Sequence, residues 1–510
     1  MSVFLALLLA PQWAPGPVLE DPSGVPFDLL GGALDRSGDL LAAGVPRADS
    51  AAGADTGKVL VFARDPATGS WSLDQEVHSW AAVLPGERFG EDVALDGGRL
   101  LAGAPLSGPL ATGAALFYTW DDALQTWRPE RRVIPSELTG GETFGAAVAL
   151  DGDFAAVGAP ETPFFGASQA GAVWTYRWDA SLGWVEEQKL QSALPIRDER
   201  FGVALDLEGD RLAVGAHGDD QRGAVHIFER DPASGQWLET AVLEAPLGDA
   251  QAGDLFGTAV DLRGDELAVG CFQDDEAALD AGALYRFVRD PGSGVWILAE
   301  KIVPPDLQAG DKLGTAVALD AGRIAAGAPF ADTLQPDSGA VFVWRFDGNF
   351  GEWRREEVLP PASPAPGDRF GQSLILGDGE LLAGAPGGDG TAGTDSGLLE
   401  VRNLVRLEAS PDPVWTAGGS ASLTARGFRP DESAWLAYSL AGLGGQFVPP
   451  LGITIALGEP AVQVGPGVPT DAQGEVTWNL AIPAGAAGRL VWFQAAQAGQ
   501  ASEVRPVQVQ

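Results

Sequence analysis

Carboxylates are the groups in this sequence whose type and spacing most clearly suggest chemistry. One set stands two residues before a recurring Phe-Gly or Leu-Gly pair, at Glu87, Glu142, Glu199, Asp254, Asp311 and Asp368. If a strand begins at each pair, these side chains meet at one end of the molecule, where a ring of carboxylates would attract cations or a basic ligand. The alternative is that each carboxylate accepts backbone N–H groups of its own turn. Because every clear copy has the residue, we favour a structural role in the turn.

A second set of carboxylates occupies loops whose sequence and length vary. These candidate ligand-binding residues are Asp219, Asp220, Asp274, Asp275, Asp332 and Asp389. We expect them in exposed surface loops, where binding specificity often resides and where their oxygens could ligate a cation such as calcium. Acidic surface loops are also ordinary in proteins that bind nothing there. The sequence thus leaves calcium open on these loops and predicts no definite metal site.

Residues that commonly carry out catalysis are sparse. The histidines are His78, His217 and His226, and the sequence contains no Gly-x-Ser-x-Gly, His-Glu-x-x-His or phosphate-loop motif. Nothing at metal-ligand spacing joins His217 to His226. Cys271 is the single cysteine, so no internal disulfide forms, and its small-residue position predicts a buried thiol. We therefore predict no catalytic residue and no enzymatic activity.

A repeat of 55 to 57 residues positions these groups. It opens at Phe89-Gly90, Phe144-Gly145, Phe201-Gly202, Phe256-Gly257, Leu313-Gly314 and Phe370-Gly371. A leucine follows each opener by six residues and a glycine by fourteen, and a degenerate first copy surrounds Leu34 and Gly44. Such a period indicates a propeller or a solenoid. The abundant glycine and proline, with frequent Val, Leu, Trp and Phe, favour an all-β chain.

Each repeat contains four predicted strands. In the third copy, two apolar runs flank the hairpin dipeptide Asp151-Gly152, and segments 171–177 and 184–190 follow as a third strand and a polar edge strand. Four strands per period make one propeller blade, so seven periods predict a seven-bladed β-propeller. The last copy lacks the tryptophan-led fourth strand, whereas Trp13 to Glu20 supplies a spare one. We predict that this segment pairs with the strand at 397–401 and closes the ring.

The repeat from Trp13 to Asn403 resembles the FG-GAP family, whose members include the seven-bladed propellers of integrin α subunits. The resemblance implies a propeller fold and extracellular recognition or adhesion. It also implies calcium in the first hairpin of a blade, but hairpins such as Asp96-Gly97-Gly98 are too short to wrap an ion, and we expect none there. Arg263-Gly264-Asp265 spells an integrin-recognition tripeptide, which we interpret as another tight turn.

The length of 510 residues predicts more than one domain. We expect a signal peptide at residues 1–12, because its apolar run is too short to span a bilayer, and a propeller at 13–403. About seven short alternating strands at 404–510 predict a C-terminal β-sandwich of immunoglobulin-like type. No segment predicts a membrane span.

The net charge of −38 argues against nucleic acid and anionic lipid as partners, since both require clustered Lys and Arg. The sequence as a whole predicts a secreted or cell-surface monomer that binds an extracellular protein or glycan through loops on one rim, without catalysis or a cofactor. One alternative is an extracellular metal-dependent lyase or glycoside hydrolase, which needs one asymmetric carboxylate cluster in a pocket. Another is a structural component of a surface layer or matrix, which would self-associate.

Overall fold

The structure is a computed structural model of an all-β chain. It describes residues 13–510 apart from 81–83, 109, 165, 220–221, 247–252, 321, 348–350, 405, 411–413, 416–419, 429–432, 440–442, 449–452, 458–461, 472–473, 482–489, 498–499, 503–504 and 510. The expected signal peptide at 1–12 lies outside the described residues. Among those described, no helix has the length and apolar character needed to cross a membrane.

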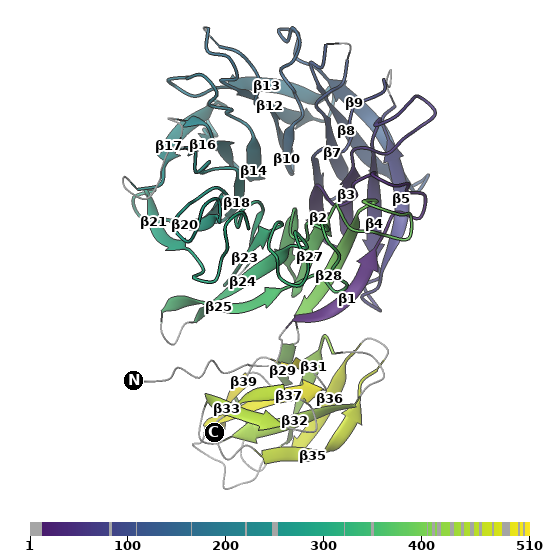
Figure 1. Cartoon of the computed structure of the whole chain (residues 1–510), viewed down its shortest axis with the longest axis vertical. Helices are drawn as coiled ribbons and strands as arrows, with labels where there is room; N and C mark the ends of the chain where they lie inside the picture. The colour runs from purple at the N-terminus through teal and green to yellow at the C-terminus, as the bar shows by residue number, and fades with distance from the viewer. Residues whose placement is uncertain are drawn as a thin grey trace.

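Seven four-stranded antiparallel sheets are arranged around a central opening (Figure 1). The first two sheets are β2 (Leu34–Ser37), β3 (Leu40–Val45), β4 (Lys58–Arg64), β5 (Trp71–His78), and β6 (Val93–Asp96), β7 (Arg99–Ala104), β8 (Ala114–Asp121), β9 (Thr126–Val133). The next two are β10 (Ala147–Asp151), β11 (Phe154–Ala159), β12 (Ala172–Asp179), β13 (Gly183–Leu190), and β14 (Ala204–Glu208), β15 (Arg211–Ala216), β16 (Ala224–Arg230), β17 (Trp237–Leu243). The fifth and sixth are β18 (Ala259–Arg263), β19 (Glu266–Cys271), β20 (Ala283–Arg289), β21 (Trp296–Ile302), and β22 (Val317–Asp320), β23 (Arg323–Ala328), β24 (Ala340–Asp347), β25 (Glu352–Leu359).

The seventh sheet combines both ends of the repeat region. Its strands are β26 (Leu374–Gly377), β27 (Glu380–Ala385), β28 (Leu398–Leu404) and β1 (Trp13–Leu19). β1 pairs antiparallel with β28, as the sequence predicts, so that Trp13 lies opposite Leu404 and Leu19 opposite Leu399. β28 thus extends to Leu404, one residue beyond the expected end of the propeller region.

Backbone contacts repeat from sheet to sheet. A bridge joins Gly57, just before β4, to the opener Phe89 of the second sheet. The same kind of bridge joins Gly397, just before β28, to Leu30, the opener of the first sheet. The seventh sheet therefore contacts the first through the same backbone positions that connect consecutive sheets.

The two recurring glycines mark the closest approach of neighbouring sheets. A Cβ atom on Gly103 in β7 would lie 1.9 Å from the backbone oxygen of Gly145, the opener glycine of the third sheet. A Cβ atom on Gly384 in β27 would lie 2.0 Å from the oxygen of Gly31 before β2. These contacts leave no room for a side chain, which explains why the opener glycine and the glycine near the end of the second strand recur together.

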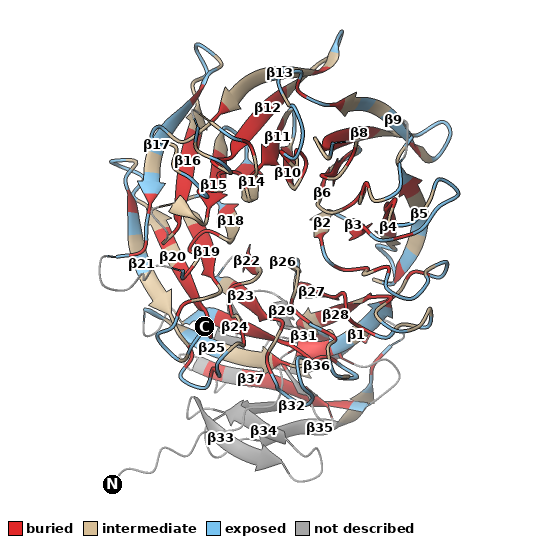
Figure 2. Cartoon of the chain, turned by 45° about the horizontal axis from the view of Figure 1, so that its top comes forward, coloured by how far each residue is buried: buried red, intermediate tan, exposed pale blue. Residues whose placement is uncertain are grey.

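Apolar cores lie between neighbouring sheets, where the second and third strands of each sheet are mostly buried (Figure 2). β1 contributes to two of these cores. Trp13 packs in the cluster shared by the sixth and seventh sheets, with Leu359 and Leu381. Leu19 packs in the cluster shared by the seventh and first sheets, with Leu41. The N-terminal strand is therefore held by side-chain burial as well as by backbone pairing.

The part of the chain after β28 contains three further sheets among the described residues. The first contains β29 (Arg406–Ser410), β31 (Ser420–Arg426) and β36 (Val476–Ala481), and β33 (Leu443–Val448) pairs with β34 (Ile453–Leu457). The largest contains β30 (Val414–Trp415), β32 (Ser433–Ser439), β35 (Val462–Pro469), β37 (Leu490–Gln497), β38 (Gln500–Ala501) and β39 (Arg505–Val509). One buried cluster unites Leu423 and Trp478 of the three-stranded sheet with Leu436 and Phe493 of the largest sheet. The strands beyond the seven expected are the two-residue β30 and β38 and the separate β33–β34 hairpin.

Candidate functional site

The two ends of the seven sheets differ in how the chain turns. At one end, which we call the hairpin rim, two residues separate the first and second strands of every sheet. At the other end, the loop rim, the second and third strands are joined by loops 46–57, 105–113, 160–171, 217–223, 272–282, 329–339 and 386–397. The hairpins between first and second strands therefore keep one length, whereas the loops range from seven residues in the fourth sheet to twelve in the first.

Three of the expected loop carboxylates are exposed on the loop rim. Asp275, Asp332 and Asp389 each accept a hydrogen bond from the backbone N–H of a later aspartate, at 2.7, 2.8 and 3.0 Å. The donor residues are Asp280, Asp337 and Asp395, whose φ angles of 51–52° lie in the left-handed region. Asp tolerates this conformation better than most residues. The three candidates thus hold their loops and keep carboxylate oxygens toward solvent.

Asp274 was expected in an exposed loop, and that expectation is wrong, because only 1% of its surface is accessible. Its Oδ2 lies 2.9 Å from Nζ of Lys301 on β21 and accepts a hydrogen bond of 3.2 Å from the Tyr285 hydroxyl. The backbone N–H of Glu276 donates to its Oδ1 at 3.0 Å. Asp274 is therefore part of the packed fifth sheet rather than a ligand for a partner.

Asp219 is partly buried and lies beside a histidine that the sequence did not connect to it. Nε2 of His226 on β16 is 3.7 Å from Oδ2 of Asp219, and Nδ1 is 2.6 Å from Oε1 of Glu239 on β17. Burial lowers the pKa of His226, but the carboxylates of Asp219 and Glu239 outweigh this effect and raise it to about 9. Asp220 lies outside the described residues.

The carboxylates before the openers have the structural role that the sequence favours. Glu142 accepts the backbone N–H groups of Thr139 and Gly140 at 2.7 and 2.6 Å. Glu199, Asp311 and Asp368 each accept the N–H of the residue three positions earlier, at 2.6–2.8 Å. All six side chains of the set are buried. Four of the six thus cap the turns that lead into the innermost strands, and the six do not form an exposed ring.

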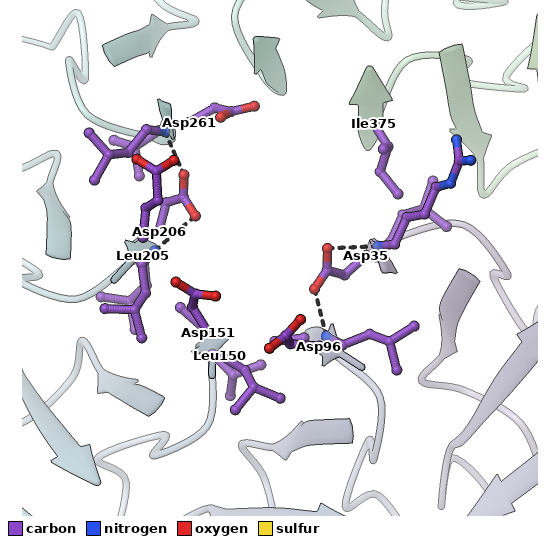
Figure 3. A pocket seen from close by; sticks show the side chains of 18 of the residues that line it. Asp35, Asp96, Leu150, Asp151, Leu205, Asp206, Asp261 and Ile375 are labelled. Atoms are coloured by element: carbon purple, nitrogen blue, oxygen red, sulfur yellow. Dashed lines mark hydrogen bonds between the residues drawn. The ribbon is translucent and has the colours of Figure 1, made fainter. Parts of the chain in front are cut away.

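A cavity of about 530 Å³ in the centre of the seven sheets has an acidic lining that the sequence analysis missed. Asp35, Asp206 and Asp261, which Figure 3 labels, line it from the innermost strands, and Asp92 lines it from just before β6. Ile375 and other apolar side chains line the part formed by the sixth and seventh sheets. The acidic residues therefore come from the first five sheets, together with Arg36 and Arg263, whereas the lining residues of the sixth and seventh sheets are apolar.

These carboxylates connect neighbouring sheets. Asp35 accepts the N–H of Leu95 in the second sheet at 2.6 Å, and Asp92 accepts that of Val148 in the third at 2.7 Å. Asp261 likewise accepts the N–H of Leu319 in the sixth sheet at 2.8 Å. Figure 3 shows the corresponding bonds of Asp35 and Asp206. The sequence signal for these carboxylates is an aspartate in or just before the innermost strand of a sheet, and only some repeats have one.

Burial disfavours the charge on the cavity carboxylates. It raises the pKa of Asp35, Asp92 and Asp261 to about 7, although the accepted backbone N–H groups lower it. Burial and the neighbouring Asp261 also raise the pKa of Asp206 well above its usual range. Carboxyl groups of this kind can exchange protons near neutral pH.

The tripeptide Arg263-Gly264-Asp265 forms the hairpin between β18 and β19. Gly264 has a φ of 58°, and the guanidinium of Arg263 pairs with Asp320 of the sixth sheet at 2.7 Å. The backbone oxygen of Asp265 accepts the N–H of Arg289 at 2.8 Å. These contacts support the interpretation as a tight turn.

Comparison with known proteins identifies the repeat. The FG-GAP repeat family matches the chain at residues 127–176, 184–228, 237–287 and 296–344. Each match begins on the outer strand of one sheet and ends on the third strand of the next. No curated protein matches the sequence. A solved Bacteroides uniformis protein, described as a candidate 6-phosphogluconolactonase, is similar at 12% identity and a TM-score of 0.45, over 68% of this chain and 89% of that one, which is too distant to inform function. The chain therefore contains FG-GAP repeats between residues 127 and 344, consistent with its resemblance to integrin α propellers.

Proposed function

We propose that this chain is a secreted or cell-surface recognition or adhesion protein that binds a protein or glycan through the loop rim, without catalysis. In this proposal the seven sheets are the blades of a closed β-propeller, and the sheets after β28 form an immunoglobulin-like β-sandwich. The pairing of β1 with β28 and the bridge between Leu30 and Gly397 support closure. The cluster shared by the three-stranded and largest C-terminal sheets supports the sandwich.

One observation carries the proposal: loop length varies on the loop rim while the first hairpin of every sheet has two residues. A rigid frame that carries loops of different length is the usual arrangement for specific binding. The loops also expose Leu110, Leu279 and Leu334, and apolar contact is a common source of affinity. With the nearby carboxylates of Asp275 and Asp332, this rim suits a partner that offers apolar and cationic groups.

The experiment compares the two rims with matched variants. In one, Leu110, Leu279 and Leu334 on the loop rim become serine. In the control, Leu124, Leu182 and Val295 in hairpins between third and fourth strands, on the hairpin rim, become serine. All six side chains are 56–70% exposed, so both variants should fold equally well.

Full-length protein is tested on arrays of glycans and of extracellular proteins. We expect saturable binding that falls at least tenfold in the loop-rim variant and stays within about twofold in the hairpin-rim control. Equal loss in both variants would contradict the choice of rim, and concentration-dependent self-association without other binding would favour the matrix component.

Hydrolysis is a second candidate because the central cavity holds carboxyl groups with a pKa of about 7, as a general acid requires. The hydrogen bonds of Asp35 and Asp92 to neighbouring sheets instead favour a structural role. Incubation with chromogenic glycosides distinguishes the two, since turnover that is lost on Asp261→Asn would establish an enzyme.

A further inference from the structure

Three side chains of the fourth sheet converge on the loop rim. The ligand atoms that Glu199, Asp219 and His226 can offer all lie within 4.8 Å of one another. Glu199 is fully buried and His226 is 2% exposed, whereas the side chain of Asp219 is 21% exposed. The group therefore has a closed base and an accessible side.

Two atoms in this group have no hydrogen bond among the described residues. Glu199 Oε2 accepts the N–H of Ile196 at 2.8 Å, but its Oε1 has no partner. His226 Nδ1 lies 2.6 Å from Glu239, so its Nε2 is the ring atom that faces Asp219, and this atom has no hydrogen-bond partner either. Leaving such buried polar atoms unsatisfied is costly, which points to a missing ligand.

The fold holds the three groups in place. The backbone N–H of Gly218 donates to the backbone oxygen of Glu199 at 3.0 Å, and a Cβ atom on Gly218 would lie 1.8 Å from the backbone oxygen of Asp198. This close approach places Asp219 beside Glu199 and requires glycine at position 218. The ring of Phe201 packs edge-on against His226, with centroids 5.1 Å apart.

We propose that Glu199, Asp219 and His226 bind one divalent first-row transition metal ion, with Glu239 orienting the imidazole. Zinc is held at about 2.1 Å by imidazole nitrogen and carboxylate oxygen, so two tetrahedral ligands lie about 3.4 Å apart. The distance of 3.7 Å between His226 Nε2 and Asp219 Oδ2 is close to that value. A carboxylate on the second ring nitrogen is the usual outer partner of a metal-binding histidine.

The fifth sheet shows what replaces the metal in a related setting. Asp274 follows the second strand of its sheet as Asp219 does, and Lys301 provides the positive charge beside it at 2.9 Å. Lys301 lies opposite Tyr285, and the equivalent pair in the fourth sheet is Val242 opposite His226. The fourth sheet thus retains the carboxylate but has valine instead of the ammonium group, and a metal ion that binds there displaces the proton of His226.

The set of ligands selects the class of ion. One imidazole nitrogen and two carboxylate oxygens suit zinc, manganese or ferrous iron, whereas calcium prefers six or more oxygens. Three protein ligands leave at least one coordination position for water or an exogenous group, as in open metal sites.

The test uses the full chain after metal removal, with Zn²⁺ as the probe. Calorimetry should give one site per chain, and Co²⁺ should give the visible absorption of a low-symmetry nitrogen–oxygen site. Zn²⁺ should raise Tm, since an ion that binds the folded chain stabilises it, while excess Ca²⁺ should leave Tm unchanged. Asp219→Asn and His226→Gln should each weaken Zn²⁺ binding at least 100-fold, and Glu239→Gln 10- to 100-fold.

Asp332→Asn is the matched control and should leave Zn²⁺ binding unchanged. Asp332 is an exposed carboxylate in the corresponding loop of the sixth sheet. If His226→Gln fails to fold, Asp219→Asn still decides, since Asp219 lies in a partly exposed loop. Zn²⁺ binding that survives Asp219→Asn, absence of Zn²⁺ binding to the parent chain, or an equal rise in Tm with Ca²⁺ would each overturn the proposal.

Discussion

Removing the two large buried side chains of β1 should detach this strand and destabilise the seventh sheet. Trp13 is 3% and Leu19 6% exposed, and they lie in separate cores. Truncating a buried Trp to Ala costs about 3–5 kcal/mol and a buried Leu about 2–5 kcal/mol. Six residues of strand separate them by roughly 20 Å, so the two effects should add. The double variant should therefore lose about 5–10 kcal/mol, which is comparable to the whole stability of many domains.

The assay is amide hydrogen exchange across the chain, combined with urea unfolding. In the double variant, the amides of β28 should exchange faster than they do in the parent. This increase should be larger for β28 than for β11. Val18→Ala is the control, because Val18 is 44% exposed on the same strand and should cost less than about 0.5 kcal/mol. If the double variant costs no more than this control, β1 does not hold the seventh sheet and the reasoning fails.

Three further predictions concern single residues. Because the pKa of Asp35, Asp92 and Asp261 is about 7 in the folded chain against 3.8 unfolded, their contribution to the unfolding free energy is complete below about pH 4 and lost as pH rises through 7. Between pH 4 and 8, the free energy of unfolding measured in urea should fall less steeply in Asp92→Asn than in the parent. Identical slopes against pH would contradict the raised pKa of Asp92. Asp274→Asn should cost about 1–3 kcal/mol because it removes the buried one of the two carboxylates that pair with Lys301, the other being Glu276 at 2.8 Å, whereas the neighbouring Asp275→Asn should cost less than about 0.5 kcal/mol; equal costs in thermal unfolding would refute the difference. Burial raises the pKa of the Cys271 thiol well above its usual range, so a thiol reagent should label it only on unfolding, and rapid labelling of the native chain would show that it is accessible.

The sequence predicts the sheets well because the repeat encodes their contacts. Glycines equivalent to Gly103 and Gly145 recur because they touch where neighbouring sheets meet. Asp-Gly pairs such as Asp151-Gly152 form the expected hairpins. The outer strand supplied by Trp13 was predictable because the last repeat lacks its own. The two glycines appear in every copy and can be aligned within a single chain.

The sequence predicts the sites poorly because they depend on features of single repeats. Asp274 looks like a loop residue until the structure shows Lys301 reaching it from another strand. Glu199, Asp219 and His226 have no motif spacing, and only the strand order brings them together. A comparison of equivalent positions gives a partial signal, since His226 stands where the fifth sheet has Tyr285.

The pairing of β1 with β28 also sets an order of events during synthesis. Trp13 leaves the ribosome first, but its partner Leu404 follows 391 residues later. At about 5–20 residues per second, β1 stays without its partner for roughly 20–80 s, while the first six sheets can already form. The seventh sheet is thus the last of the seven to be completed, and a nascent chain that stalls before β28 keeps an apolar strand available to chaperones or to other chains.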